Sequence, residues 1–252
     1  MDTTELLKRV QTVEIKTRRL VSEVMTGQYS SAFRGRGMEF DEVRAYVPGD
    51  DVRSIDWNVT ARTGAPHVKR FVEERELAVV LVVDVSASNR FGSGARFKAD
   101  LIAELSALLS FSATRSNDKV GLLLFSDSVE TYVPPRKGRR HALRVLRELI
   151  AFDQPRARTN IAAALEYLGR VLRRKAVVFL ISDFLDRGYE RALRLTRRRH
   201  DLICVTVADP REEELPSSGL LYLQDPETGE TLLVDAGSRA FRDRFARQGA
   251  RR

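Results

Sequence analysis

The sequence predicts an α/β protein with a doubly wound, mostly parallel sheet and helices on both faces. The first observation is a set of short apolar runs without a polar face, which is typical of strands buried on both sides of a parallel sheet. These runs are Leu77–Val83, Val120–Phe125, Val177–Ile181 and Leu202–Val207. The second observation is that helical patterns separate them, and strand–helix alternation indicates this architecture.

The predicted helices have apolar residues at a spacing of three or four. They cover residues 95–115, 139–151, 161–172 and 189–196. Residues 129–133 follow the second strand across a three-residue turn, so we expect an antiparallel edge strand there. Two weaker strands, residues 220–223 and 231–234, and a helix near 238–247 complete the prediction.

The chain divides by composition into two predicted parts, residues 1–76 and residues 77–252. Residues 3–25 have the pattern of an amphipathic helix, which ends at Gly27. Glycine and proline then interrupt short alternating segments as far as residue 76. We therefore expect a small irregular N-terminal appendage ahead of the α/β domain.

Composition limits the class of protein. The 252 residues carry a net charge of +8 and a single cysteine, Cys204, which excludes an intramolecular disulfide and a multi-cysteine metal site. The longest apolar stretch has seven residues, far short of the ~20 that cross a bilayer. Since no secretory signal is visible either, the prediction is a cytoplasmic protein without a membrane span.

The positive charge is concentrated in residues 136–199, which hold 18 Lys and Arg against 6 Asp and Glu. Most of it lies in three runs, Arg136–Arg140, Arg173–Lys175 and Arg197–Arg199. Two interpretations stay open. The runs are solvated ends of helices, or they form a surface for an acidic partner or nucleic acid. Aromatic residues are not interleaved with them, which disfavours binding of single-stranded nucleic acid.

A D-x-S-x-S motif, Asp84, Ser86 and Ser88, stands where the first predicted strand ends. Residues two apart in an extended chain project to the same side, so one carboxylate and two hydroxyls converge there. Asp183 ends the third apolar run, and Thr159 precedes a predicted helix. Ligands of open α/β sheets bind beyond the carboxyl ends of strands, where these residues are expected to meet.

All five side chains offer hard oxygen donors, and no His or Cys is among them. Such a set selects Mg²⁺, Mn²⁺ or Ca²⁺ over Zn²⁺ or Cu²⁺. Because Ca²⁺ usually takes more carboxylates, two carboxylates with neutral hydroxyls favour Mg²⁺, with Mn²⁺ or Ca²⁺ as alternatives. A cation held this way keeps a position that attracts an incoming carboxylate.

Asp84-x-Ser86-x-Ser88, Thr159 and Asp183, in this order of elements, resemble the metal-ion-dependent adhesion site of von Willebrand factor A domains. The resemblance implies direct coordination by the hydroxyls and Asp84, with Asp183 acting through water. Upstream segments around Gly35–Phe40, Val43–Asn58 and Glu73–Leu77 resemble the bacterial family called domain of unknown function fifty-eight. The resemblance implies a von Willebrand A-like domain, and members of that family are commonly linked with MoxR-type AAA+ ATPases.

Other features of the sequence have simpler interpretations. Asp50, Asp51 and Asp56 resemble an acidic cluster, but we predict turn bonding and ion pairs for them. Trp57 is predicted to anchor the appendage to the sheet. A phosphotransferase with an aspartate at this strand end needs a second acid two residues later, where Ser86 stands, so we predict no enzymatic activity.

The function expected from the sequence is a non-enzymatic module that binds a protein partner through a metal. The partner supplies an acidic side chain to Mg²⁺, and the resemblance implies a MoxR-type AAA+ ATPase as its setting. The alternative is a basic surface that binds polyanions or nucleic acid, with the metal site vestigial. A nucleic acid is the less favoured partner, because no recognition motif accompanies the arginines.

Overall fold

A computed structural model describes residues 10, 12–14, 17, 37–74, 77–94, 97–152, 158–225 and 228–249. The chain forms two compact units, Ser30–Leu77 and the remainder. Each unit is described by itself. The N-terminal helix predicted over residues 3–25 lies mostly outside the described residues. Val10, residues 12–14 and Thr17 are helical, in agreement with that prediction as far as they extend.

The larger unit is built on a five-stranded sheet in the order β5-β4-β3-β6-β7. Its strands are β3 (Ala78–Asp84), β4 (Lys119–Phe125), β5 (Val129–Arg136), β6 (Val177–Ser182) and β7 (Asp201–Thr206). All pairs are parallel except β4 with β5. The mostly parallel α/β sheet and its antiparallel edge strand are therefore confirmed.

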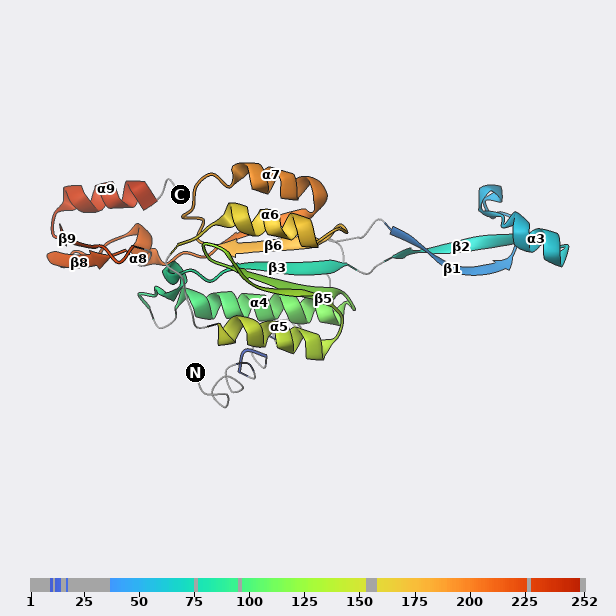
Figure 1. The fold of residues 1–252 in the computed structure, drawn as a ribbon, viewed down its shortest axis with the longest axis horizontal. Coiled ribbons are helices and arrows are strands. Elements are labelled where there is room, and N and C mark those ends of the chain that lie inside the picture. Colours follow the sequence, from blue (N-terminus) through green and yellow to red (C-terminus); the bar gives the residue numbers. More distant parts are fainter. Residues whose placement is uncertain are drawn as a thin grey trace. The chain divides into compact units, whose positions relative to one another are not determined.

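Helices cover both faces of this sheet (Figure 1). One face carries α4 (Lys98–Arg115) and α5 (Arg139–Ala151), and the other carries α6 (Ile161–Val171) and α7 (Glu190–Arg199). Alternate residues of a strand point to opposite faces. Val80 and Val82 accordingly pack with Leu165 and Leu168 of α6 in one apolar core.

Strand β7 differs from the prediction of a strand buried on both faces. β3, β4 and β6 are buried almost throughout, whereas β7 alternates between exposed and partly buried residues, and Cys204 is exposed. The physical reason is position, because β7 pairs only with β6 and forms the edge of the sheet. Apolar composition alone does not distinguish an edge strand from a central one.

The smaller unit is more regular than the sequence predicted. Strands β1 (Gly37–Ala45) and β2 (His67–Glu74) form an antiparallel pair, and η1 (Val52–Ser54) and α3 (Trp57–Thr63) lie between them in the chain. One described glycine of this unit has a clear structural role: Gly64 ends α3 with a φ of 72°. Left-handed backbone of this kind favours glycine.

The C-terminal part of the larger unit adds a short helix, a hairpin and a last helix. They are α8 (Pro210–Glu213), β8 (Leu220–Gln224), β9 (Thr231–Asp235) and α9 (Arg239–Gly249). β8 and β9 pair antiparallel, as the sequence predicted. No described helix is both long and apolar enough to cross a bilayer.

Candidate metal site

The candidate site lies at the carboxyl edge of the parallel sheet, where β3 and β6 end side by side. Asp84 is the last residue of β3 and Ser182 is the last residue of β6. The register pairs Val83 with Ile181, so Asp84 and Ser182 occupy equivalent positions on neighbouring strands. The sheet therefore places a carboxylate and a hydroxyl next to one another.

The carboxylate of Asp84 is fully buried and is held by two uncharged donors. Its Oδ1 accepts a hydrogen bond from the backbone N–H of Ser86 at 2.9 Å, and its Oδ2 accepts one from Ser182 Oγ at 2.6 Å. Burial raises the pKa of the Asp84 carboxyl, against the lowering effect of these hydrogen bonds. No ion pair joins it to a cationic side chain among the described residues.

The two serines of the motif lie in the turn that follows β3. Ser86 directly precedes the 3-10 helix η2 (Ala87–Arg90), and its Oγ lies 3.0 Å from Ser88 Oγ. Both residues are almost completely buried. Asn89 fixes the turn, since its Nδ2 donates to the backbone oxygen of Asp84 at 2.9 Å. The two hydroxyls and the carboxylate are thus gathered within five consecutive residues.

Asp183 follows Ser182 directly, and its carboxylate is engaged on both oxygens. Lys98 Nζ donates to Oδ2 at 3.0 Å, and the backbone N–H of Leu185 donates to Oδ1 at 3.2 Å. Burial is the main cause of the raised pKa of Asp84, and the charge of Asp183 adds to it. The turn after β6 places Phe184 at a φ of 58°, and Ser182 Oγ accepts from its N–H at 3.1 Å.

Thr159 lies at the same edge, in the loop before α6. The loop is anchored at two points: the N–H of Asn160 donates to the backbone oxygen of Ser126 at 2.7 Å, and the N–H of Ile161 donates to Asp186 Oδ2 at 2.8 Å. Ser126 directly follows β4, which neighbours β3. Thr159 itself is partly buried. These two bonds place the loop of Thr159 beside the end of β4 and the turn after β6.

A buried lysine at this edge was not predicted. Lys98 is the first residue of α4, is 2% exposed, and also donates to Glu212 Oε1 at 2.7 Å. Glu212 belongs to α8, where its Oε2 accepts from the N–H of Asp209 at 3.2 Å. Asp209 in turn accepts from the N–H of Ser93 at 2.8 Å. One network of charged and polar groups thus connects α4, α8 and the turn after β6.

The residues of this edge fit a hard divalent cation. Asp84 is a buried carboxylate without a cationic partner among the described residues, and Asn89 Oδ1 is a buried oxygen without a hydrogen-bond partner there. The carboxylate of Asp84, the amide Oδ1 of Asn89 and the two serine hydroxyls of the motif all offer oxygen donors, and such donors suit Mg²⁺. The described residues contain no group of three or more His, Cys, Asp or Glu that could hold a metal ion, so a cation at this edge would depend on hydroxyl oxygens as well as carboxylates.

Two further members of the site were missed in the sequence, Ser182 and Lys98. Ser182 was open to prediction, because parallel strands in register place equivalent residues side by side. Lys98 carried no such signal. A lysine in the first turn of a helix is normally a solvated residue, and its contact with Asp183 spans 85 positions in the chain.

The acidic residues of the smaller unit have structural partners, as predicted. Asp50 accepts two hydrogen bonds from the Arg44 guanidinium, at 2.8 and 2.7 Å, and this partner holds the pKa of the carboxyl below its usual value. Asp51 caps η1 and Asp56 caps α3. The ion pair of Asp56 is with Lys69, at 3.3 Å. Trp57, the first residue of α3, is 68% exposed, so the smaller unit does not bury it.

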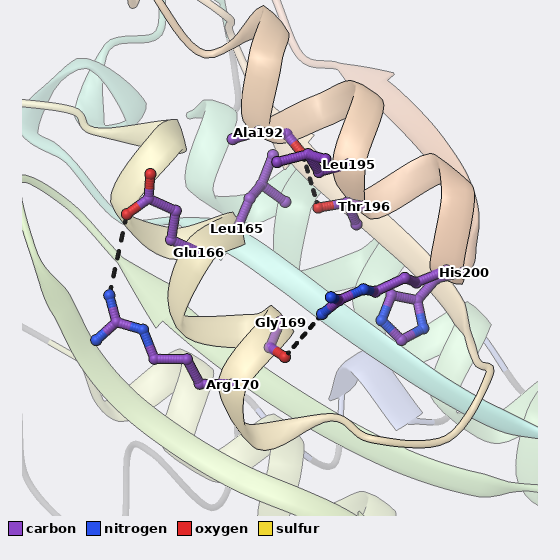
Figure 2. Close-up of a pocket in the computed structure, with 9 residues that line it drawn as sticks. Leu165, Glu166, Gly169, Arg170, Ala192, Leu195, Thr196 and His200 are labelled. Carbon is purple, nitrogen blue, oxygen red and sulfur yellow. Dashed lines mark hydrogen bonds and ion pairs between the residues drawn. The ribbon is translucent and has the colours of Figure 1, made fainter.

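The three basic runs lie at the opposite edge of the sheet, where the parallel strands begin. Arg136 pairs with Val120 at the start of β4, Lys175 precedes β6, and Arg199 ends α7 just before β7. Beside Arg199, α6 and α7 enclose a surface groove of about 360 Å³ (Figure 2). Its apolar lining includes Leu165 and Leu195.

His200 closes one end of this groove and is 3% exposed. Neither ring nitrogen has a hydrogen-bond partner among the described residues. Burial lowers the pKa of His200, and the neighbouring charge of Arg199 lowers it further. Both ring nitrogens are buried, so a molecule in the groove does not reach them in this conformation.

The fold and this edge together define a doubly wound α/β protein with oxygen-bearing side chains near the strand ends. A family model described as "Protein of unknown function DUF58" matches residues 42–252. An uncharacterized protein of Mycobacterium tuberculosis (strain ATCC 25618 / H37Rv) is 38% identical over 255 residues, which cover 99% of this chain and 80% of the relative. The chain therefore belongs to the DUF58 family.

Two solved structures are similar at 18% sequence identity. An aerotolerance-related membrane protein from Bacteroides fragilis NCTC 9343 has a TM-score of 0.48, over 69% of this chain and 88% of that one. A conserved hypothetical protein, BatB from Bacteroides thetaiotaomicron, has a TM-score of 0.47, over 69% and 87%.

Proposed function

We propose that this DUF58 protein is a non-enzymatic module that binds a protein partner through a divalent cation, Mg²⁺ being the favoured metal. The observation that carries the proposal is the buried carboxylate of Asp84, which has only uncharged donors around it among the described residues. A buried charge without a counter-charge is costly, and a bound cation removes that cost.

Asp84, Ser86 and Ser88 would hold the cation, with Thr159 and Asp183 completing the set. The two serine hydroxyls are 3.0 Å apart, close enough to contribute to one coordination sphere. Lys98 and the N–H of Leu185 occupy Asp183, which favours a role for Asp183 through water over direct coordination. When bound, the cation supplies a site of positive charge for an oxygen ligand from outside the chain.

A carboxylate of a partner protein is the ligand that this arrangement favours. The hydroxyls neutralise none of the charge of the cation, so a further anionic oxygen is attracted to it. The earlier resemblance adds a MoxR-type AAA+ ATPase as the setting in which such a module acts as an adaptor in protein assembly or remodelling. The cytoplasm as its compartment is part of the same proposal.

An enzymatic role is disfavoured by the chemistry of the turn after β3. A second acid two residues beyond Asp84 is absent, since Ser86 stands there with its hydroxyl beside Ser88. Proton transfer to a leaving group therefore has no evident donor at that position. The proposal assigns binding rather than catalysis to this edge.

Calorimetric titration with Mg²⁺ tests the metal, comparing the native chain with Asp84→Ala. We expect binding by the native chain and at least a hundredfold weaker binding by the variant. Asp51→Ala is the matched control, because it removes a carboxylate that caps η1 in the smaller unit. Equal affinity of the native chain and Asp84→Ala would remove the metal from the proposal.

A second candidate function is binding of a polyanion or nucleic acid. Its site would be the basic surface at the amino edge of the sheet, the edge where the parallel strands begin. All the arginines of the three runs are exposed, and Arg199 lines the groove between α6 and α7. Binding of this kind weakens steeply with added salt. A titration of labelled DNA at low and high salt tests it, and absence of binding at low salt would exclude it.

A further inference from the structure

The ammonium group of Lys98 is unusual in its burial and its place in the fold. Its side chain is 1% exposed, and it stands in the first turn of α4. The amino end of a helix carries partial positive charge, so a cation there is unfavourable unless carboxylates compensate it. Asp183 at 3.0 Å and Glu212 at 2.7 Å provide that compensation.

The same carboxylate of Asp183 belongs to the proposed metal set, so two cations depend on one anion. We infer that Lys98 is an internal competitor that lowers the affinity of the site for divalent cations; this inference rests on the proposed metal site. A divalent cation beside Asp183 is repelled by the ammonium, and the surrounding burial strengthens that repulsion relative to water. The hydrogen bond from Lys98 also holds the carboxylate of Asp183 in one orientation, which favours metal binding. This contribution is a single hydrogen bond, and we expect the repulsion to exceed it.

Glu212 gives the ammonium a second partner when Asp183 shares its charge with a metal through water. The Lys98–Glu212 contact is the shorter of the two, and Glu212 also accepts a hydrogen bond from the backbone N–H of Asp209, the residue before α8. When the metal binds, the ammonium of Lys98 therefore moves toward Glu212 of α8 and keeps a carboxylate partner. Occupancy of the site is thereby linked to the segment that leads into the C-terminal hairpin.

Mg²⁺ titrations of the full chain and of Lys98→Met test the inference. Methionine keeps the length and apolar stem of lysine and removes its charge. We expect Lys98→Met to bind Mg²⁺ at least tenfold more tightly than the native chain. Lys175→Met is the matched control, because Lys175 also pairs with an aspartate, Asp201 at 2.9 Å, but at the opposite edge of the sheet; its affinity should equal that of the native chain.

Thermal unfolding with and without Mg²⁺ distinguishes a lysine that competes with the metal from one that only stabilises the fold. Without metal, Lys98→Met leaves two carboxylates unpaired, so its Tm should fall below that of the native chain. Saturating Mg²⁺ should then raise the Tm of the variant more than that of the native chain. A purely structural lysine predicts a lower Tm with an equal or smaller Mg²⁺ shift.

Glu212→Gln gives an independent test, because its Mg²⁺ affinity should fall where that of Lys98→Met should rise. It replaces Lys98→Met as the test if that variant does not fold. Removing the charge of Glu212 leaves Lys98 more dependent on Asp183, so Mg²⁺ binding should weaken severalfold. Unchanged or weaker binding by folded Lys98→Met, or tighter binding by Glu212→Gln, would overturn the inference while the native chain still binds Mg²⁺. If neither the native chain nor the variants bind Mg²⁺, the proposed metal site fails instead.

Discussion

The two edges of the sheet use charged residues in opposite ways. At the carboxyl edge, Asp84, Asp183 and Lys98 are buried and their polar atoms have specific partners. At the amino edge, the arginines of the basic runs are exposed and their contacts lie at the surface: Arg139 Nε donates to Glu14 Oε1 at 2.9 Å, and Arg199 donates to the Gly169 oxygen at 3.4 Å. The carboxyl edge has fewer charged residues than the amino edge, but more of them have specific partners.

This contrast teaches that burial, more than the amount of charge, distinguishes a built site from a solvated surface. Exposed charges are screened by water and salt, and each contributes little to stability. Buried charges cost free energy unless a partner compensates them. The carboxyl edge should therefore respond strongly to single substitutions and the amino edge weakly.

Asp84→Asn should have the largest effect on stability at the carboxyl edge. The amide keeps the shape of the side chain and the acceptor for the Ser86 N–H, but it removes a buried charge. In buffer with chelator, we expect the free energy of unfolding to rise by about 2 kcal/mol, measured by urea denaturation. Added Mg²⁺ should no longer stabilise the variant.

A loss of stability in chelator for Asp84→Asn would contradict this account. It would mean that the carboxylate is favourably compensated without any metal. The proposed need for a cation would then have no basis.

Ser182→Ala should have the next largest effect. The hydroxyl donates to Asp84 Oδ2 at 2.6 Å and accepts from the N–H of Phe184 at 3.1 Å, so its removal takes a partner from a buried carboxylate oxygen and from a partly buried N–H. We expect a loss of about 1–3 kcal/mol in the free energy of unfolding. Ser128→Ala is the control, because Ser128 is exposed and its Oγ contacts only Asp127 at 3.1 Å among the described residues. Equal losses in the two variants would remove the distinction between buried and exposed hydroxyls.

His200→Phe tests a buried group on the opposite side of the molecule, at the end of α7. Burial lowers the pKa of His200 in the folded protein, so the unfolded chain takes up the proton first as the pH falls. The stability that depends on neutral His200 is complete above the ordinary pKa of about 6.5 and is lost at lower pH.

Urea denaturation from pH 8 to pH 5.5 measures this dependence. We expect the native chain to lose up to about 1 kcal/mol more than His200→Phe over that range. Parallel curves for the two proteins would show that His200 does not contribute to the acid sensitivity.

The combined substitution Arg197→Ala, Arg198→Ala and Arg199→Ala should have the smallest effect on stability. We expect a change of less than about 0.5 kcal/mol per substitution, since all three side chains are exposed. If the amino edge binds polyanions, the same variant should bind DNA with a shallower dependence on salt. A loss of stability comparable to that of Ser182→Ala would mean that this edge is also a built site.

Local patterns were sufficient for most of the secondary structure. The apolar runs before Asp84 and Asp183 and the amphipathic stretches between them predict strands and helices, because period and length are properties of short segments. The same holds for Asp84, Ser86 and Ser88, which a single turn brings together. Exposure of β7 and the length of the β1–β2 pair were not predictable in this way, because both depend on which strands become neighbours.

The pairing around Asp183 was decided by packing over long distances in the chain. A helix that begins at Lys98 and another that contains Glu212 meet beside the end of β6, although 85 and 114 residues separate the interacting pairs. No local pattern specifies such a meeting, since it requires the whole sheet and its covering helices to be in place. Once they are, water is excluded, and a residue type that is usually solvated becomes the counter-charge of two carboxylates.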